Sequence, residues 1–238
     1  MKVTDEKGAG RVGLGIGARC WTMFHVKRRL FVAGGLSVGG DSQGGMKWRD
    51  MEEQQPRLAG LGEERLIKPG VVLVGTIRRD GTPRLSPVEP WVMDGVLWLC
   101  MMWQSAKARD LMRDPRVLVH SIITNREGAE GEFKIRGTVW QETSSDVQQR
   151  YSDEVTQALG WTPSPERSHL FGVNIEDVTY MSYETATGDQ HVAMWPPGRE
   201  FIRHGDSGTS VGDPEPVHDI IQVRSSRDVN NLNRSSGQ

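Results

Sequence analysis

The chain has 238 residues, of which 36% are hydrophobic and 25% are charged, with 28 glycines. These values are typical of a soluble globular protein with one core domain, and they exclude a fibrous or fully disordered chain. The formal net charge is -2, so no overall field would attract nucleic acid or an anionic membrane. No apolar run has the length that a membrane-spanning helix requires.

The cysteines and histidines give no indication of a metal site. Cys20 and Cys100 are far apart and lack the CxxC spacing of zinc sites and disulfide frameworks. The histidines match no metal-binding spacing and no nucleophile–base motif. We therefore expect no metal, and a reducing, cytoplasmic setting.

Both ends of the chain lack the patterns of a folded core. Residues 1–45 are rich in glycine and show neither helical nor strand periodicity, which predicts a disordered leader. Such a leader is also what a misplaced start codon would add, in which case it is not native. The Ser-, Arg- and Asn-rich residues 219–238 are predicted to be a disordered tail.

The middle of the chain alternates between short helical and strand patterns. A short polar helix is predicted over 52–68, a capped helix over 105–114 and a longer one over 144–160, where Ser precedes and Gly ends the pattern. Turn residues such as Asp94-Gly95 separate the strands. The six predicted strands are 71–79, 83–93, 96–103, 116–124, 132–142 and 171–184.

This order predicts the fold class. Short strands in hairpin succession, with one helix after the third strand and another inserted late, favour an antiparallel barrel over a parallel sheet. We expect a mainly β protein with a six-stranded antiparallel split β-barrel and short capping helices. Residues 187–218 are expected to form an extension of this domain.

A candidate anion site lies in the run WQSAKARDLMRDPRV at 103–117. It ends a strand, turns once and begins a helix whose first turn carries a hydroxyl, Ser105, and an ammonium, Lys107. Free amides at a helix start, the positive end of the helix dipole and these two side chains would converge on one phosphate. The alternative is that Ser105 only caps the helix and Lys107 is a solvated surface charge.

A second motif, DGTPRLSPVEPWVMDG at 80–95, stands directly upstream at hairpin spacing. Together the two motifs resemble the pyridoxamine-phosphate-oxidase-like, FMN-binding split-barrel superfamily, in which a DGxPxxSPV hairpin precedes an SxKxRxLxxDPR helix. The resemblance covers roughly residues 66–184. It implies a split-barrel cofactor-binding domain over 46–186.

The resemblance implies a set of cofactor contacts. The cofactor phosphate would lie against the second strand and the helix start, at Arg84, Ser86, Ser105 and Lys107. The third strand, with Met101 and Trp103 among its residues, would lie beside the flavin ring. For Met101 and Trp103 the alternative is ordinary barrel packing.

Residues 133–141 resemble the family's fifth strand, which contributes to the cofactor site of a partner subunit. This implies a homodimer with Arg136 near its interface. The alternative for Arg136 is an exposed or ion-paired side chain on a strand.

The resemblance implies an FMN-dependent oxidoreductase that acts on a small organic substrate. Hydride transfer is the chemistry of the bound flavin, so it needs no catalytic side chain, and we assign none. Two alternatives remain open. One is a reductase of the same fold that uses coenzyme F-420, a deazaflavin; the other is a non-catalytic protein that binds a flavin or haem.

Overall fold

The computed structural model describes residues 45–126, 128–206 and 210–217. The predicted leader, except for Gly45, and the predicted tail lie outside these residues. The described helices are α1 (Trp48–Gln54), α2 (Pro56–Gly62), the π-helical turn η1 (Glu63–Ile67), α3 (Ala106–Arg113), α4 (Ser145–Leu159) and η2 (Pro165–Arg167). The described strands are β1 (Val72–Ile77), β2 (Pro83–Val88), β3 (Pro90–Met93), β4 (Val96–Met102), β5 (Arg116–His120), β6 (Glu132–Gln141), β7 (Ser168–Tyr183), β8 (Gln190–Trp195), β9 (Arg199–Arg203), β10 (Gly205–Asp206), β11 (Ser210–Val211) and β12 (Glu215–Pro216).

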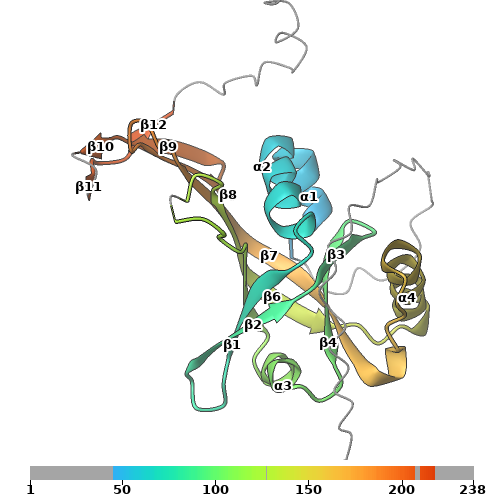
Figure 1. Ribbon diagram of the computed structural model, residues 1–238. Coiled ribbons are helices and arrows are strands. Elements are labelled where there is room, and N and C mark those ends of the chain that lie inside the picture. Colours follow the sequence, from blue (N-terminus) through green and yellow to red (C-terminus); the bar gives the residue numbers. More distant parts are fainter. Residues whose placement is uncertain (1–44, 127, 207–209, 218–238) are drawn as a thin grey trace, which may run out of the picture. The chain divides into compact units, whose positions relative to one another are not determined.

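The main sheet is antiparallel throughout. Its strands follow the order β12-β9-β8-β7-β6-β5-β1-β2, while β4 pairs with β7 and β3 with β4. Figure 1 shows these strands curving around a common interior, with helices at the periphery. The predicted fold class, mainly β with short helices, is confirmed.

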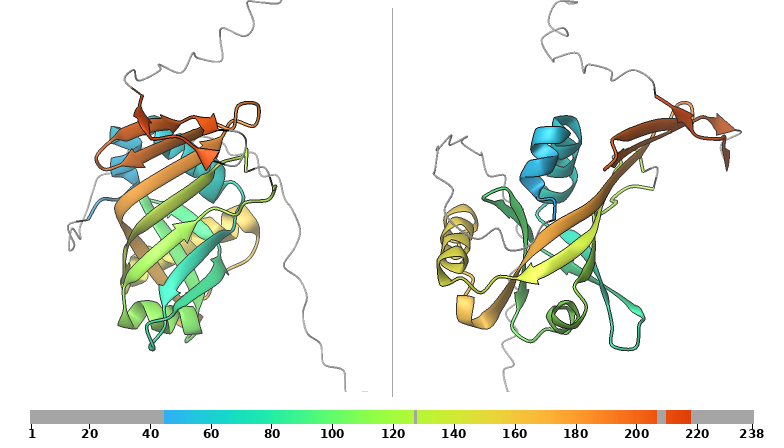
Figure 2. Two further views of the ribbon diagram at one scale, coloured as in Figure 1. Left: turned by 90° about the vertical axis from the view of Figure 1, so that its left-hand side faces the viewer. Right: turned by 180° about the vertical axis from the view of Figure 1, so that it is seen from behind.

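The long strand β7 divides the sheet. One edge of β7 pairs with β6 along most of its length. On the other edge, β4 pairs with Ser168–Gly172 and β8 pairs with Val178–Tyr183. Two different layers therefore share one strand, and Figure 2 shows the β8–β9 layer continuing beyond α1 and α2.

The main sheet of the described residues has ten strands rather than the predicted six, because one predicted strand is divided and further strands are added after the sixth. The strand expected over 83–93 is divided at Glu89 into β2 and β3, which pair with β1 and β4 respectively. Two prolines flank Glu89, and proline cannot donate a ladder hydrogen bond, so the strand breaks there. The extension expected over 187–218 adds strands to the main sheet through β8.

The helical segment predicted over 52–68 is less polar than expected. It begins at Trp48, and the turn between α1 and α2 comes directly before Pro56. Trp48, Met51 and Leu66 are fully buried in the main core. The helices α1 and α2 therefore close one end of the sheet, whereas α4 packs its Tyr151 and Val155 into a second, smaller core.

A steric test of this packing is available at Gly172, where β7 passes beneath the ring of Trp140. A Cβ at Gly172 would overlap the indole, which is confined between β6 and the smaller core. We expect Gly172→Ala to lower the free energy of unfolding by about 1–3 kcal/mol, the usual cost of overpacking. Chemical denaturation monitored by circular dichroism measures the change.

The control is Gly60→Ala in α2, where nothing lies within 4 Å of the added methyl group. This variant is expected to be neutral or more stable, because alanine has the higher helix propensity. Equal destabilisation by the two substitutions would contradict the packing described at Gly172.

Candidate functional site

The start of α3 has the geometry of an anion site. Ser105 is its N-cap, and the Ser105 hydroxyl accepts a hydrogen bond from the Ala108 amide at 3.4 Å. The Arg109 amide donates to the Ser105 carbonyl. Within the described chain, no backbone acceptor is found for the amides of Ala106 and Lys107, so the first turn keeps free donors at the positive end of the helix.

Lys107 connects this helix start to β2. Its Nζ donates to the Pro87 carbonyl at 2.9 Å. Partial burial lowers the pKa of Lys107, and the nearby carboxylate of Glu89 partly offsets this effect. The ammonium has three donors, so two remain for a ligand after the Pro87 contact. Lys107 is therefore held at the helix start rather than extended into solvent.

Arg84 makes the reciprocal connection, from β2 to α3. Its Nε donates to Asp110 Oδ2 at 2.6 Å, and the Thr76 hydroxyl donates to the same oxygen at 3.1 Å. The Asp110 side chain is almost fully buried. Burial alone raises the pKa of Asp110, but the hydrogen bonds from Arg84 and Thr76 outweigh it, and the pKa lies below its ordinary value.

Two of the four principal candidates, Arg84 and Lys107, connect β2 and α3 through their side chains. Arg84 and Ser86 are two residues apart on β2 and both are half-buried, as expected for one face of a strand. Ser105 and Lys107 stand on the α3 side. We call this arrangement the β2–α3 seam. The sequence motifs predicted Arg84, Ser86, Ser105 and Lys107 as site residues, but not Asp110. The only sequence feature that could have indicated Asp110 is its position five residues after Ser105 in the same helix motif.

The side chains of Met101 and Trp103 lie in different surroundings. Met101 is buried in the main core, so its side chain has the packing role given as its alternative. Trp103 is 54% exposed and stacks on His169, with ring centroids 4.4 Å apart. Gln104, directly after it, has a φ of 55°, which turns the chain sharply into α3. Trp103 therefore presents an aromatic face close to the helix start.

Arg136 lies elsewhere, on the opposite side of the sheet from the core. It is exposed on β6 and donates to Glu176 at 2.5 Å and to Asp177 at 2.6 Å. These contacts raise the pKa of the guanidinium, with Asp177 as the main cause. In the single chain, Arg136 is an ion-paired side chain on a strand, which is the alternative that the sequence left open for it. It does not lie in the β2–α3 seam.

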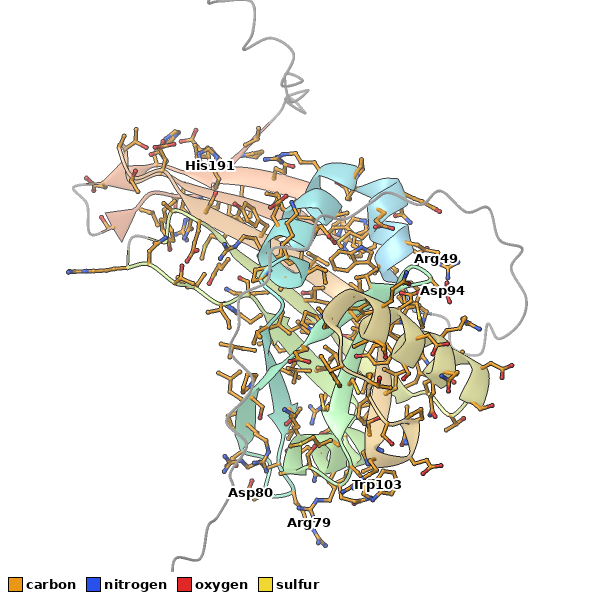
Figure 3. The ribbon with its side chains drawn as sticks, turned by 45° about the vertical axis from the view of Figure 1, so that its right-hand side comes forward. Arg49, Arg79, Asp80, Asp94, Trp103 and His191 are labelled. Atoms are coloured by element: carbon orange, nitrogen blue, oxygen red, sulfur yellow. The ribbon has the colours of Figure 1, made fainter. Side chains whose placement is uncertain are left out.

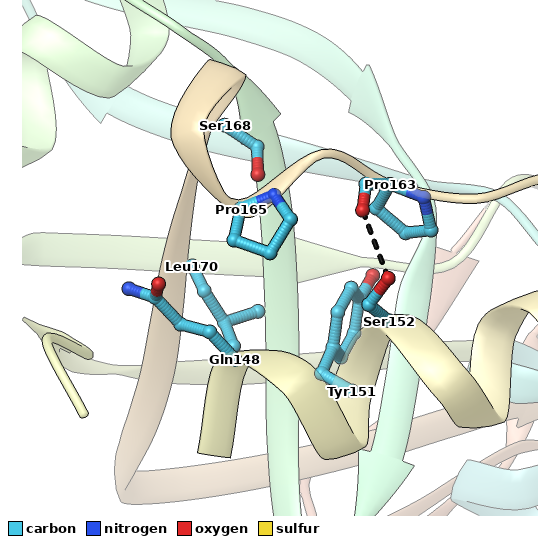
Figure 4. Close-up of a pocket in the computed structure, with 7 residues that line it drawn as sticks. All are labelled: Gln148, Tyr151, Ser152, Pro163, Pro165, Ser168 and Leu170. Atoms are coloured by element: carbon cyan, nitrogen blue, oxygen red, sulfur yellow. Dashed lines mark hydrogen bonds between the residues drawn. The ribbon is translucent and has the colours of Figure 1, made fainter. Parts of the chain in front are cut away.

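Two cavities differ greatly in their capacity. One, beside α4, is lined by Tyr151, Ser152 and Leu170 among others and has a volume of about 10 Å³, enough for one water. Figure 4 shows the Ser152 hydroxyl donating to the Pro163 carbonyl at its edge, at 2.9 Å. The other, between the β1–β2 hairpin and α3, has a volume of about 570 Å³. Only the second has room for a ligand.

The described residues contain no group of three or more His, Cys, Asp or Glu side chains that could hold a metal ion. None of the helices among them has both the length and the apolar character to cross a membrane.

The observed architecture is an antiparallel split barrel with short helices, which defines the class of protein. A sequence profile of the pyridoxamine 5'-phosphate oxidase family matches residues 62–182, just over half of the chain. The chain belongs to this family. The family and the split-barrel fold expected from the two motifs are confirmed.

Solved structures with local likeness include a pyridoxamine 5'-phosphate oxidase candidate from Listeria innocua, with 14% identity over 52% of this chain and 94% of that one and a TM-score of 0.43. A haem-binding protein from Mycobacterium smegmatis has 15% identity over 65% and 86% of the two chains and a TM-score of 0.41. An F420 reductase has 18% identity over 49% and 94%, with a TM-score of 0.40. A search of curated proteins finds no match.

The contact between Gln104 and His169 generates a pH-dependent prediction. His169 is buried, and its Nε2 lies 3.2 Å from the Gln104 amide, which must donate to an unprotonated nitrogen. Burial lowers the pKa of His169. The folded state therefore favours the neutral ring, whereas the unfolded state takes up a proton near pH 6.5.

The resulting stability is present above about pH 6.5 and is lost as the pH falls below it towards the lower folded-state pKa. Between pH 7.5 and 5, the free energy of unfolding of the wild type is expected to decrease more steeply than that of His169→Gln. The exposed His191, substituted in the same way, serves as the control and should keep the wild-type slope. Parallel curves for wild type and His169→Gln would contradict this role.

Proposed function

We propose that this protein is an oxidoreductase that binds FMN with the phosphate group in the β2–α3 seam. The observation that carries the proposal is that Lys107 is held between β2 and a helix start with free amides capped by Ser105, in a member of the pyridoxamine 5'-phosphate oxidase family. Arg84 of β2 pairs with Asp110 further along the same helix. A fixed ammonium, an oriented guanidinium and backbone donors form a donor set that suits a phosphate dianion.

The residues of the seam have separate tasks in this proposal. The amides and Lys107 bind the phosphate, and Asp110 orients Arg84 towards it. Trp103, held against His169, offers an aromatic surface to a planar ring. Bound FMN would supply the hydride chemistry, and the chain would position a small organic substrate.

A deazaflavin also carries a phosphate, and the seam supports coenzyme F-420 as the second candidate cofactor. Absorption of protein purified from its native host separates them. Two visible bands indicate FMN, and a single band near the violet indicates the deazaflavin. A turnover assay with a reduced nicotinamide cofactor and artificial acceptors then separates an enzyme from a protein that only binds flavin or haem, because the latter would show saturable binding without turnover.

The phosphate contact is tested by Lys107→Ala. Loss of one charge-assisted hydrogen bond is expected to weaken FMN binding roughly tenfold or more. Ser105→Ala should weaken it further. Affinities follow from titration of the intrinsic flavin fluorescence.

Two controls separate the phosphate contact from damage to the fold. Riboflavin lacks the phosphate, so its weaker binding should be nearly the same in wild type and Lys107→Ala. Lys68→Ala removes an exposed lysine that is paired with Glu64 and lies outside the seam, and it should leave FMN affinity unchanged. Unaltered FMN and deazaflavin affinity in Lys107→Ala would reduce Lys107 to a structural link with Pro87.

We also propose that the protein acts as a cytoplasmic homodimer, joined through the outer face of β1, β2 and β5. On this face Leu85 and Leu118 are 63% and 40% exposed. Both lie opposite Gly75 in the sheet register, so they flank a shallow strip without a side chain. Arg136 follows Leu118 in the same row, which agrees with its expected place near an interface.

Substitution of Leu85 and Leu118 by Asp tests this surface. The double variant is expected to elute with half the mass of the wild type in light scattering, because buried unpaired carboxylates disfavour association. Leu159→Asp, on the exposed side of α4, is the matched control and should keep the wild-type mass. A wild-type protein that is monomeric at micromolar concentration and still binds stoichiometric cofactor would rule out a site shared between subunits.

A further inference from the structure

The pocket between the β1–β2 hairpin and α3 is lined mainly by charged side chains. Its volume is about 570 Å³. Figure 3 shows Arg79 and Asp80 at the tip of the hairpin, at the same end of the molecule as Trp103. The residues that line the pocket are Arg78, Arg79, Asp80, Arg84, Ala106, Arg109, Asp110 and Arg113.

We propose that this arginine pocket binds an elongated polyanion, a molecule that carries two or more phosphate or carboxylate groups in series. Five arginines and two aspartates line it, so positive charge exceeds negative charge by three. Guanidinium groups pair with phosphate and carboxylate in fork geometry, and gathering them in one concavity without an anion is electrostatically unfavourable.

The internal carboxylates are already engaged. Asp110 accepts hydrogen bonds from Arg84 at 2.6 Å and from Arg113 at 3.4 Å. Asp80 accepts from the Thr82 amide and hydroxyl at the turn of the hairpin, which lowers the pKa of Asp80. Neither aspartate is therefore a free counter-ion for the remaining arginines.

Two arginines of the pocket keep their full donor sets. Throughout the described parts of the chain, Arg79 and Arg109 form neither an ion pair nor a side-chain hydrogen bond with another residue. They come from different elements, the hairpin turn and α3, and so approach a ligand from two sides. Arg78, next to Arg79, adds a third charge at the same edge.

The shape of the pocket determines how many anionic groups it can hold. Ala106, Arg109, Asp110 and Arg113 follow the i, i+3, i+4, i+7 pattern of one helix face, so the pocket runs from the first turn of α3 to the last. At 1.5 Å per residue this face is about 10 Å long. One phosphate would bind the guanidinium groups of one or two arginines, so the arginines at the other end of the pocket would have no anionic partner.

This inference goes beyond the proposed function and does not depend on which ring system the protein binds. Ala106 both begins α3 and lines the pocket, so the pocket opens next to the β2–α3 seam. The proposed polyanion is a molecule separate from the cofactor whose phosphate lies in the seam.

Calorimetric titration of the full chain with small polyanions tests the proposal. The probes are inorganic triphosphate, citrate and inorganic monophosphate, at constant ionic strength. Triphosphate or citrate is expected to bind at least about tenfold more tightly than monophosphate, since a second charged fork contact is added. Which of the two is preferred identifies phosphates or carboxylates as the natural groups. Equal, weak binding of all three probes would overturn the proposal.

Matched variants locate the binding. The double variant Arg79→Ala and Arg109→Ala is expected to lose the preference for the polyanion, with affinity reduced at least about tenfold. The double variant Arg126→Ala and Arg199→Ala removes the same charge from exposed positions outside the pocket and should bind as the wild type does. Equal losses in both would show a non-specific charge effect and overturn the site.

Two further measurements keep the result interpretable. If the alanine variant unfolds, the double variant Arg79→Lys and Arg109→Lys keeps the charges without the guanidinium forks. Its affinity for triphosphate should lie between those of the wild type and the alanine variant, and wild-type affinity would count against fork recognition.

FMN titration of the same variants separates this proposal from the proposed function. Lys107→Ala should weaken FMN but not triphosphate, and the Arg79 and Arg109 variant should show the reverse.

Discussion

The buried carboxylate of Asp110 joins three elements at one point. Its donors are Thr76 from β1, Arg84 from β2 and Arg113 from α3 itself. A carboxylate this deeply buried is tolerated only when its oxygens are hydrogen-bonded and its charge is paired. The position of α3 against the hairpin therefore depends on this network. Both the seam and the arginine pocket are formed between those same elements.

The network also explains how so many arginines share one end of the molecule. Asp110 lies between Arg84 and Arg113 and neutralises part of their mutual repulsion. In doing so it fixes the Nε side of Arg84, so the orientation of the guanidinium is set before any ligand arrives. Lys107 is fixed in a similar way by the Pro87 carbonyl. The seam is thus preorganised by contacts with the backbone and with a buried acid.

The sheet provides the rigid frame for this end of the molecule. β7 pairs with three strands, and at Gly172 it approaches β6 so closely that the ring of Trp140 occupies the space of a side chain. The same strand carries His169, on which Trp103 stacks. The exposed aromatic face near the helix start is therefore anchored to the strand that holds the whole sheet together.

The sequence by itself determined the local structure and the family. Capping by Ser105, the hairpin turn at Asp94 and the strand patterns depend on neighbours along the chain, and the two motifs carry the family resemblance. Only the tertiary structure decided which distant groups meet. Arg136 pairs with Glu176 and Asp177, and Met101 is buried in the core. The arginines of the hairpin and of α3 line one pocket. The physical reason is that charge pairing and burial depend on distances through space, which no periodicity along the chain records.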